Sequence, residues 1–268
     1  DSFFLADKFP GYDVSNFGKH EEIFNKQLEK CQTDYFDFYL YHNVCELNID
    51  KYLEDEELTN FLLKMKEEGK IRHLGFSCHG SLDVMHRFIM KHFRHIEFCQ
   101  IQLNYLDFEF QNAKDKVEEL NNIGIPIWVM EPLRGGKLAK SCLGGEKLLA
   151  KSNPDWTPAN WAFSFVETVP GVTMILSGMS NFEQLKQNIA FFDTIISNFC
   201  AIKAFRRVES FNAEGLLMQV VKQGIRHKTE AQIVVIYLHL RLIRLFIMLP
   251  ELTENLAARM DFIPEISQ

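Results

Sequence analysis

The stretch DYFDFYLYHN, residues 34–43, decides the fold class of this chain. Its centre, residues 36–41, is rich in aromatic residues and lacks Gly and Pro, which is typical of a β-strand covered on both faces. The stretch leads to His42, where we expect the buried strand to end and meet solvent. Parallel α/β folds place their chemistry at the carboxyl ends of strands. His42 is therefore a candidate active-site residue, and a histidine that only ends a strand is the alternative.

Five more strands are predicted around this one, and a helical pattern follows each strand. With the strand ending at His42, the predicted strands are residues 3–8, 36–42, 70–77, 98–103, 125–130 and 172–176. The predicted helices are residues 16–31, 53–66, 82–91, 111–122, 157–168 and 181–192.

This regular alternation indicates a parallel sheet with right-handed crossovers, which both an open doubly wound sheet and a (β/α)8 barrel would satisfy. No G-x-G-x-x-G follows the first strand, so the dinucleotide fingerprint of the open sheet is missing and a barrel is favoured. We predict an incomplete (β/α)8 TIM barrel over residues 1–196, with about six β/α units and its N-terminal strands absent.

Residues 197–268 break the pattern and are predicted to form a helical C-terminal extension. Residues 200–224 are partly periodic, and residues 233–249 are almost wholly apolar and long enough to span a membrane. Arg241 and Arg244 argue against insertion, at roughly 2.5–3.5 kcal/mol for each central arginine. We expect a core or interface helix there, with a membrane tether as the alternative.

The composition narrows the classes of partner and compartment. The chain has 268 residues and a net charge of −7, which argues against binding nucleic acid. Its six cysteines form no C-x-x-C pair, and we expect no signal peptide before the first strand. Dispersed cysteines are typical of reduced thiols in a cytoplasmic protein and not of a disulfide framework or a zinc site.

The predicted strand ends gather polar residues. A lysine close to a histidine can polarise a carbonyl oxygen, and neutral amides and hydroxyls can orient an amide such as the nicotinamide carboxamide. Arg134-Gly135-Gly136 offers N–H groups and a cation to a pyrophosphate, and the helix start at Asn181 favours a phosphate. Solvated or loop-starting side chains are the alternative throughout. The residues at these ends are Lys8, His42, Ser77, Gln102, Asn104, Met130, Glu131, Ser177 and Gly178.

Six segments together resemble the aldo-keto reductase family, over about residues 1–195. They are ADKFP (6–10), TDYFDFYLYH (33–42), GKIRHLGFS (69–77), QIQLNY (100–105), MEPLRGGKL (130–138) and SGMSN through QN (177–188). Within the family the chain is most similar to the branch that carries a ferredoxin-like iron–sulfur extension. The resemblance implies reversible hydride transfer between NADP(H) or NAD(H) and a small-molecule carbonyl or alcohol.

The resemblance also implies roles for single residues. Lys8 matches the lysine that lowers the pKa of a catalytic tyrosine, and His42 matches the histidine that orients the carbonyl. The family's aspartate and tyrosine belong to a strand upstream of residue 1, so a catalytically incomplete nucleotide-binding or interaction module is the alternative function. Gln184 stands where an arginine is frequent, which leaves the choice between NAD and NADP open. The implied cofactor-binding residues are Ser77, Gln102, Met130, Leu133, Arg134, Gly135, Gly136, Leu138, Ser177, Gly178, Met179, Gln184, Gln187 and Asn188.

The extension departs from that branch. The branch would place four clustered cysteines at about residues 229–250, and this chain has none there. Because an iron–sulfur cluster needs thiolate ligands, we predict no cluster and no other metal site. A divergent end or a change of reading frame would each explain the apolar stretch.

Overall fold

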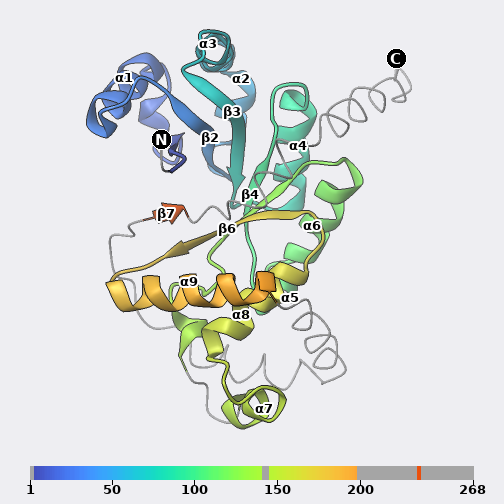
Figure 1. The fold of residues 1–268 in the computed structure, drawn as a ribbon. Coiled ribbons are helices and arrows are strands. Elements are labelled where there is room, and N and C mark those ends of the chain that lie inside the picture. Colours follow the sequence, from blue (N-terminus) through green and yellow to red (C-terminus); the bar gives the residue numbers. More distant parts are fainter. Residues whose placement is uncertain (1–2, 141–144, 198–233, 237–268) are drawn as a thin grey trace.

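The computed structural model describes residues 3–140, 145–197 and 234–236. Six parallel strands lie side by side in chain order, and helices connect one strand to the next (Figure 1). Nothing in the described part of the chain pairs with the outer edge of β1, so the sheet stays open. This arrangement confirms the incomplete barrel. The strands are β1 (Ala6–Phe9), β2 (Phe36–Val44), β3 (Ile71–Cys78), β4 (Cys99–Gln102), β5 (Ile127–Met130) and β6 (Val172–Gly178).

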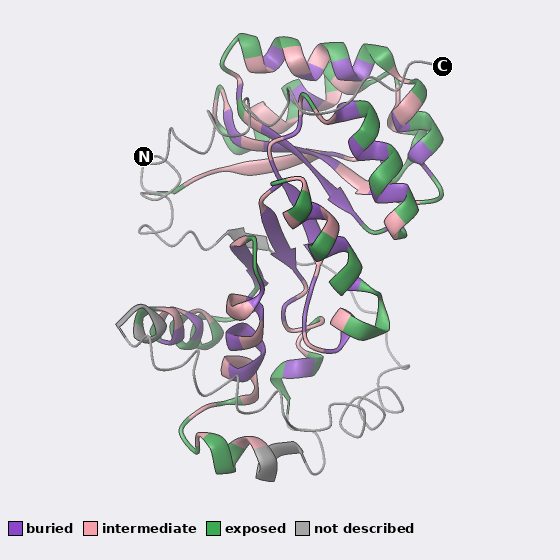
Figure 2. Cartoon of the chain, turned by 90° about the vertical axis from the view of Figure 1, so that its right-hand side faces the viewer, coloured by how far each residue is buried: buried purple, intermediate pink, exposed green. Residues whose placement is uncertain are grey.

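The helices cover one face of the sheet and turn their polar sides to solvent, as the green outer faces in Figure 2 show. Several begin at residues that cap the first turn: the side chains of Asp55, Ser81 and Thr157 accept N–H groups of α3, α4 and α8. The helices are α1 (His20–Cys31), α2 (Ile49–Glu54), α3 (Glu56–Glu67), α4 (Leu82–His92), α5 (Asp107–Phe110), α6 (Ala113–Asn122), α7 (Gly145–Ser152), α8 (Pro158–Thr168) and α9 (Phe182–Ser197), with 3-10 turns η1 (Val14–Asn16) and η2 (Lys137–Ala139).

Alternate strand residues separate two packed layers. One layer lies between sheet and helices and includes Tyr39 and Tyr41 of β2. The other lies on the inner face of the sheet, where Leu40 packs in one cluster with Phe98, Trp128, Met174 and Leu176. Because side chains alternate along a strand, every second residue counted from this inner cluster faces the barrel interior.

Several predicted boundaries are wrong in ways that local backbone explains. The helix expected from residue 16 starts at His20, after Gly18 turns the chain with φ +82°. Residues 53–66 belong to two helices, because Asp55 ends α2 and caps α3. Strand β2 does not end at His42 but continues to Val44, with a register shift after Tyr41.

The other elements differ less, and some were not predicted. Strand β1 is Ala6–Phe9, slightly later than expected, and β6 extends to Gly178. The helices α5 and α7 were missed because four and eight residues are too short for a clear periodic pattern. The predicted strands at residues 98–103 and 125–130 are four residues long in the structure.

One short strand corrects the prediction for the tail. Residues 233–249 were expected to be helical, but Val234–Ile236 form β7, which pairs antiparallel with β6 (Figure 1). Its three residues are all β-branched, which favours a strand. The predicted helix at residues 200–224 and the rest of the apolar stretch lie outside the described residues. Across the ranges that the structure describes, no helix is both long and apolar enough to cross a membrane.

Candidate active site

Lys8 and His42 lie at the carboxyl ends of β1 and β2. Lys8 pairs in register with Leu40, a member of the inner cluster, and His42 is two residues further along the same strand. Alternation therefore turns Lys8 toward the barrel interior. His42 follows where β2 shifts register, and the charge of Lys8 still acts on it, so both lie at the same end of the sheet. The ring of the exposed Tyr12 stands edge-on to the His42 ring, with 5.4 Å between their centroids.

The electrostatics of these residues show that they share one environment. Burial lowers the pKa of Lys8 to about 8, against the opposing charge of Asp7. Burial also lowers the pKa of His42 to about 4, and the charge of Lys8 acts in the same direction. His79 behaves alike: desolvation and then the charge of Lys8 lower its pKa to about 4. At neutral pH the cluster thus holds one ammonium and two neutral imidazoles.

Ser77 and Met130 have the same inward orientation. Ser77 of β3 pairs with Gln100, which is two residues from the inner-cluster residue Phe98, and its hydroxyl accepts the backbone N–H of Asn43 at 2.9 Å. Because that oxygen is already an acceptor, its own hydrogen remains for donation. Met130 is two residues past Trp128 on β5 and is buried.

Gln102 also faces inward, at the end of β4, and belongs to a polar network. Its Nε2 donates to Oδ2 of Asp107 at 2.8 Å, and Nδ2 of Asn104 donates to the same oxygen at 2.6 Å. Arg134 donates to it through Nε at 3.2 Å. Asp107 is fully buried, so the loops after β4 and β5 are joined through one carboxylate.

The loop after β5 has the backbone expected of an anion-binding turn. Arg134, Gly135 and Gly136 are consecutive left-handed residues, with φ of +48°, +61° and +79°. The N–H groups of the two glycines have no hydrogen-bond partner in the described part of the chain. A Cβ added to Gly136 would meet nothing within 4 Å, so a ligand can approach the backbone there. These groups fit a pyrophosphate, while Leu133 and Leu138 close the loop through a backbone hydrogen bond.

The residues predicted on the adenosine side form a second group around the start of α9. Asn181 caps this helix by accepting the N–H of Gln184, whose own side chain accepts from the backbone and hydroxyl of Ser180. Gln184 and Gln187 are exposed. The buried Asn188 donates to Oγ of Ser177 at 3.1 Å. Gly178 is exposed and Met179 is buried beside it.

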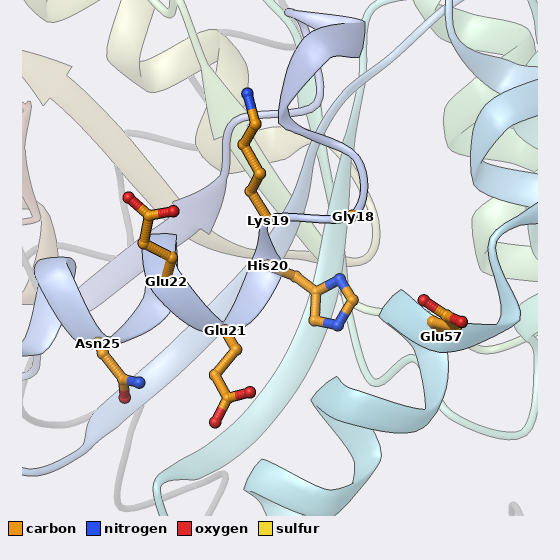
Figure 3. Close-up of a pocket in the computed structure, with 7 residues that line it drawn as sticks. All are labelled: Gly18, Lys19, His20, Glu21, Glu22, Asn25 and Glu57. Carbon is orange, nitrogen blue, oxygen red and sulfur yellow. The ribbon is translucent and has the colours of Figure 1, made fainter.

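None of these residues lines the open pocket of about 470 Å³ at the start of α1 and α3 (Figure 3). Its lining includes three glutamates, so it repels phosphate groups and does not fit the predicted cofactor. The lining residues are Gly18, Lys19, His20, Glu21, Glu22, Asn25 and Glu57.

Two residues of this region were missed in the sequence. His79 lies two positions after Ser77, so the alternation of β3 could have placed it at the same mouth. Asp107 lies three positions after Asn104, whose Oδ1 accepts the N–H of Asp107. An Asn-x-x-Asp spacing after a strand is the signal that could have found it.

Comparison with known proteins agrees with the fold. The model of the aldo/keto reductase family matches residues 1–199. The uncharacterized oxidoreductase YqkF of Bacillus subtilis (strain 168) is 22% identical over 191 residues, which cover 63% of this chain and 58% of that protein. The chain thus spans less than two thirds of this relative's length.

Solved structures give the same result. The holo form of aldo-keto reductase AKR11C1 from Bacillus halodurans has a TM-score of 0.56 at 22% identity, covering 85% of this chain and 74% of that one. An aldo/keto reductase from Klebsiella pneumoniae in complex with NADP and acetate has a TM-score of 0.55 at 20% identity, covering 88% and 74%. At identities this low, the structural similarity shows a common fold and nothing more.

Proposed function

Because this chain belongs to the aldo/keto reductase family, we propose that it is an oxidoreductase that uses NADP(H) or NAD(H) and interconverts a small carbonyl compound and its alcohol. The observation that carries this proposal is the position of Lys8, His42, Ser77, Gln102 and Met130 near the carboxyl ends of five neighbouring parallel strands.

Lys8 and His42 would bind the reacting carbonyl. With a pKa of about 4 the imidazole of His42 is neutral at pH 7, so it can donate one N–H to the carbonyl oxygen. The ammonium of Lys8 lies in the same environment and favours negative charge on that oxygen as it develops. Bound nicotinamide would supply or accept the hydride.

The remaining predicted residues would orient the dinucleotide. Ser77 and Gln102 would hold the carboxamide, and Met130 would pack against the ring. Arg134 and the N–H groups of Gly135 and Gly136 would bind the pyrophosphate. The adenosine portion would reach the segment that begins at Ser177, where Gln184 in place of a cation leaves both nucleotides as candidates.

A fluorescence titration with NADPH, followed by addition of a test aldehyde, tests the proposal. Saturable binding followed by aldehyde-dependent oxidation of NADPH is the expected result. Binding without oxidation would favour a nucleotide-binding module in place of an enzyme. A parallel titration with NADH separates the two cofactors, and failure of both nucleotides to bind would overturn the proposal.

A further inference from the structure

We propose that Asp107 is a positioning residue of the nucleotide site, whose carboxylate fixes the side chains of Gln102 and Arg134 relative to each other. The inference rests on the proposed function, because these two residues belong to the carboxamide and pyrophosphate ends of that site. Asp107 would not contact the nucleotide itself and would act through these two partners.

The contacts of Asp107 converge on one atom. Its Oδ2 accepts from Nε2 of Gln102 at 2.8 Å and from Nε of Arg134 at 3.2 Å. Asn104 donates to the same oxygen, and its second donor contact is to the backbone oxygen of Glu131 at 3.0 Å. The end of β4, helix α5 and the loop after β5 therefore share one anchor.

The network also holds Asp107 in place. The backbone N–H groups of Leu106 and Asp107 donate to Oδ1 of Asn104, at 3.1 and 2.9 Å. The carboxylate is fully buried, and its Oδ1 has no hydrogen-bond partner within the described residues. The backbone contacts with Asn104 and the three donors to Oδ2 thus favour one position for the carboxylate, which is what a positioning residue requires.

The hydrogen bond to Asp107 fixes the amide orientation of Gln102. Nε2 of Gln102 donates to Oδ2 of Asp107, so this nitrogen points toward the carboxyl group. Its Oε1 is then the atom left to face the cofactor, where it would accept from the carboxamide NH2 group. Arg134 likewise uses Nε for Asp107, and within the described residues its Nη groups have no hydrogen-bond partner, so both could bind a phosphate.

The test measures the dissociation constant of NADPH by fluorescence for Asp107→Asn, Arg134→Gln and the double variant. We expect Asp107→Asn to weaken binding about 10–100-fold, as loss of an orienting partner does in other sites. Because Asp107 acts partly through Arg134, its effect should shrink in the Arg134→Gln background. Unchanged affinity in Asp107→Asn, or strictly additive effects, would overturn the inference.

A matched control separates positioning from stability. Asp37 is also a buried aspartate paired with an arginine, Arg72, at 2.6 Å, but it lies at the opposite end of β2. Asp37→Asn should leave the affinity for NADPH unchanged even where it lowers the melting temperature. An equal loss of affinity in Asp37→Asn would show that the effect is general destabilisation and overturn the inference.

If Asp107→Asn does not fold, Arg134→Lys decides. Lysine keeps the charge but lacks the guanidinium fork, so loss of affinity close to that of Arg134→Gln is expected. Affinity equal to that of the unaltered chain would overturn the inference. No NADPH binding by the unaltered chain would instead overturn the proposed function, and this inference with it.

Discussion

Lys8 and His42 lie at the carboxyl ends of the neighbouring strands β1 and β2, and the charge of Lys8 contributes to the lowered pKa of His42. Register places Lys8 opposite Leu40, two residues before His42. Two groups brought together in this way, one cationic and one neutral, can share a ligand oxygen. The first two predictions follow from this pair.

Replacing Lys8 by methionine removes the positive charge and keeps most of the side-chain length. We expect reduction of a test aldehyde to be lost while the affinity for NADPH is largely kept, because the proposed role of Lys8 concerns the carbonyl oxygen. Steady-state rates and a fluorescence titration measure the two quantities. Lys19→Met, at an exposed position, is the control, and unchanged turnover in Lys8→Met would disprove the assignment.

The pH dependence of reduction should report the same ammonium. Since the pKa of Lys8 is lowered to about 8, the group loses its charge as the pH rises through that value. Reduction at saturating cofactor should therefore decline above about pH 8. In Lys8→Arg the charge persists to higher pH, so this decline should shift upward if the variant is active. A decline at the same pH in both proteins would exclude Lys8 as its source.

Gly136 offers a test of the phosphate loop. Its φ of +79° disfavours any residue with a Cβ, although the space around it is open. Gly136→Ala should weaken NADPH binding through the changed backbone. Gly69, with φ +75° and equally open surroundings, lies in the turn after α3, so Gly69→Ala has the same backbone cost far from the site. Equal affinities in the two variants would contradict the assignment of the loop.

His92 makes stability depend on pH. It is fully buried beside the rings of Tyr41 and Phe88, and burial lowers its pKa to about 4. Between this value and an unfolded pKa near 6.5 the unfolded chain binds more protons, so the free energy of unfolding should fall as the pH decreases from about 6.5 to 4. For His92 the loss amounts to about 3 kcal/mol at most.

Denaturant titrations across this pH range, comparing two variants, measure that dependence. His92→Phe should reduce the slope, because it removes one of the buried imidazoles that must be neutral in the fold. Met90→Leu, at an exposed position of the same helix, should keep it. A slope unaffected by His92→Phe would assign the acid sensitivity to other groups.

The alternation of strands and the inward direction of their last residues could be predicted from sequence, because both follow from local periodicity. Phe36 to Tyr41 could only be a buried strand, and Lys8 and Ser77 lie one residue before the ends of β1 and β3. Boundaries were harder, since a single residue such as Asp55 can end one helix and begin another.

The polar network around Asp107 depends on contacts between loops that are distant in sequence. Arg134 is 27 residues from Asp107, and no local pattern specifies that they meet. The antiparallel pairing of β7 with β6 has the same origin, because β-branched residues allow a strand but do not name its partner. Contacts between distant parts of the chain therefore determine both the Asp107–Arg134 contact and the β6–β7 pairing.

The most direct test that the residues at these strand ends form one nucleotide site is an NMR titration with isotope-labelled histidine. NADPH should shift the ring signals of His42, whereas adenosine diphosphate ribose, which lacks the nicotinamide ring, should bind without shifting them to the same extent. His95, outside the mouth, should respond to neither. Saturable NADPH binding that leaves the His42 signals unchanged would contradict the account.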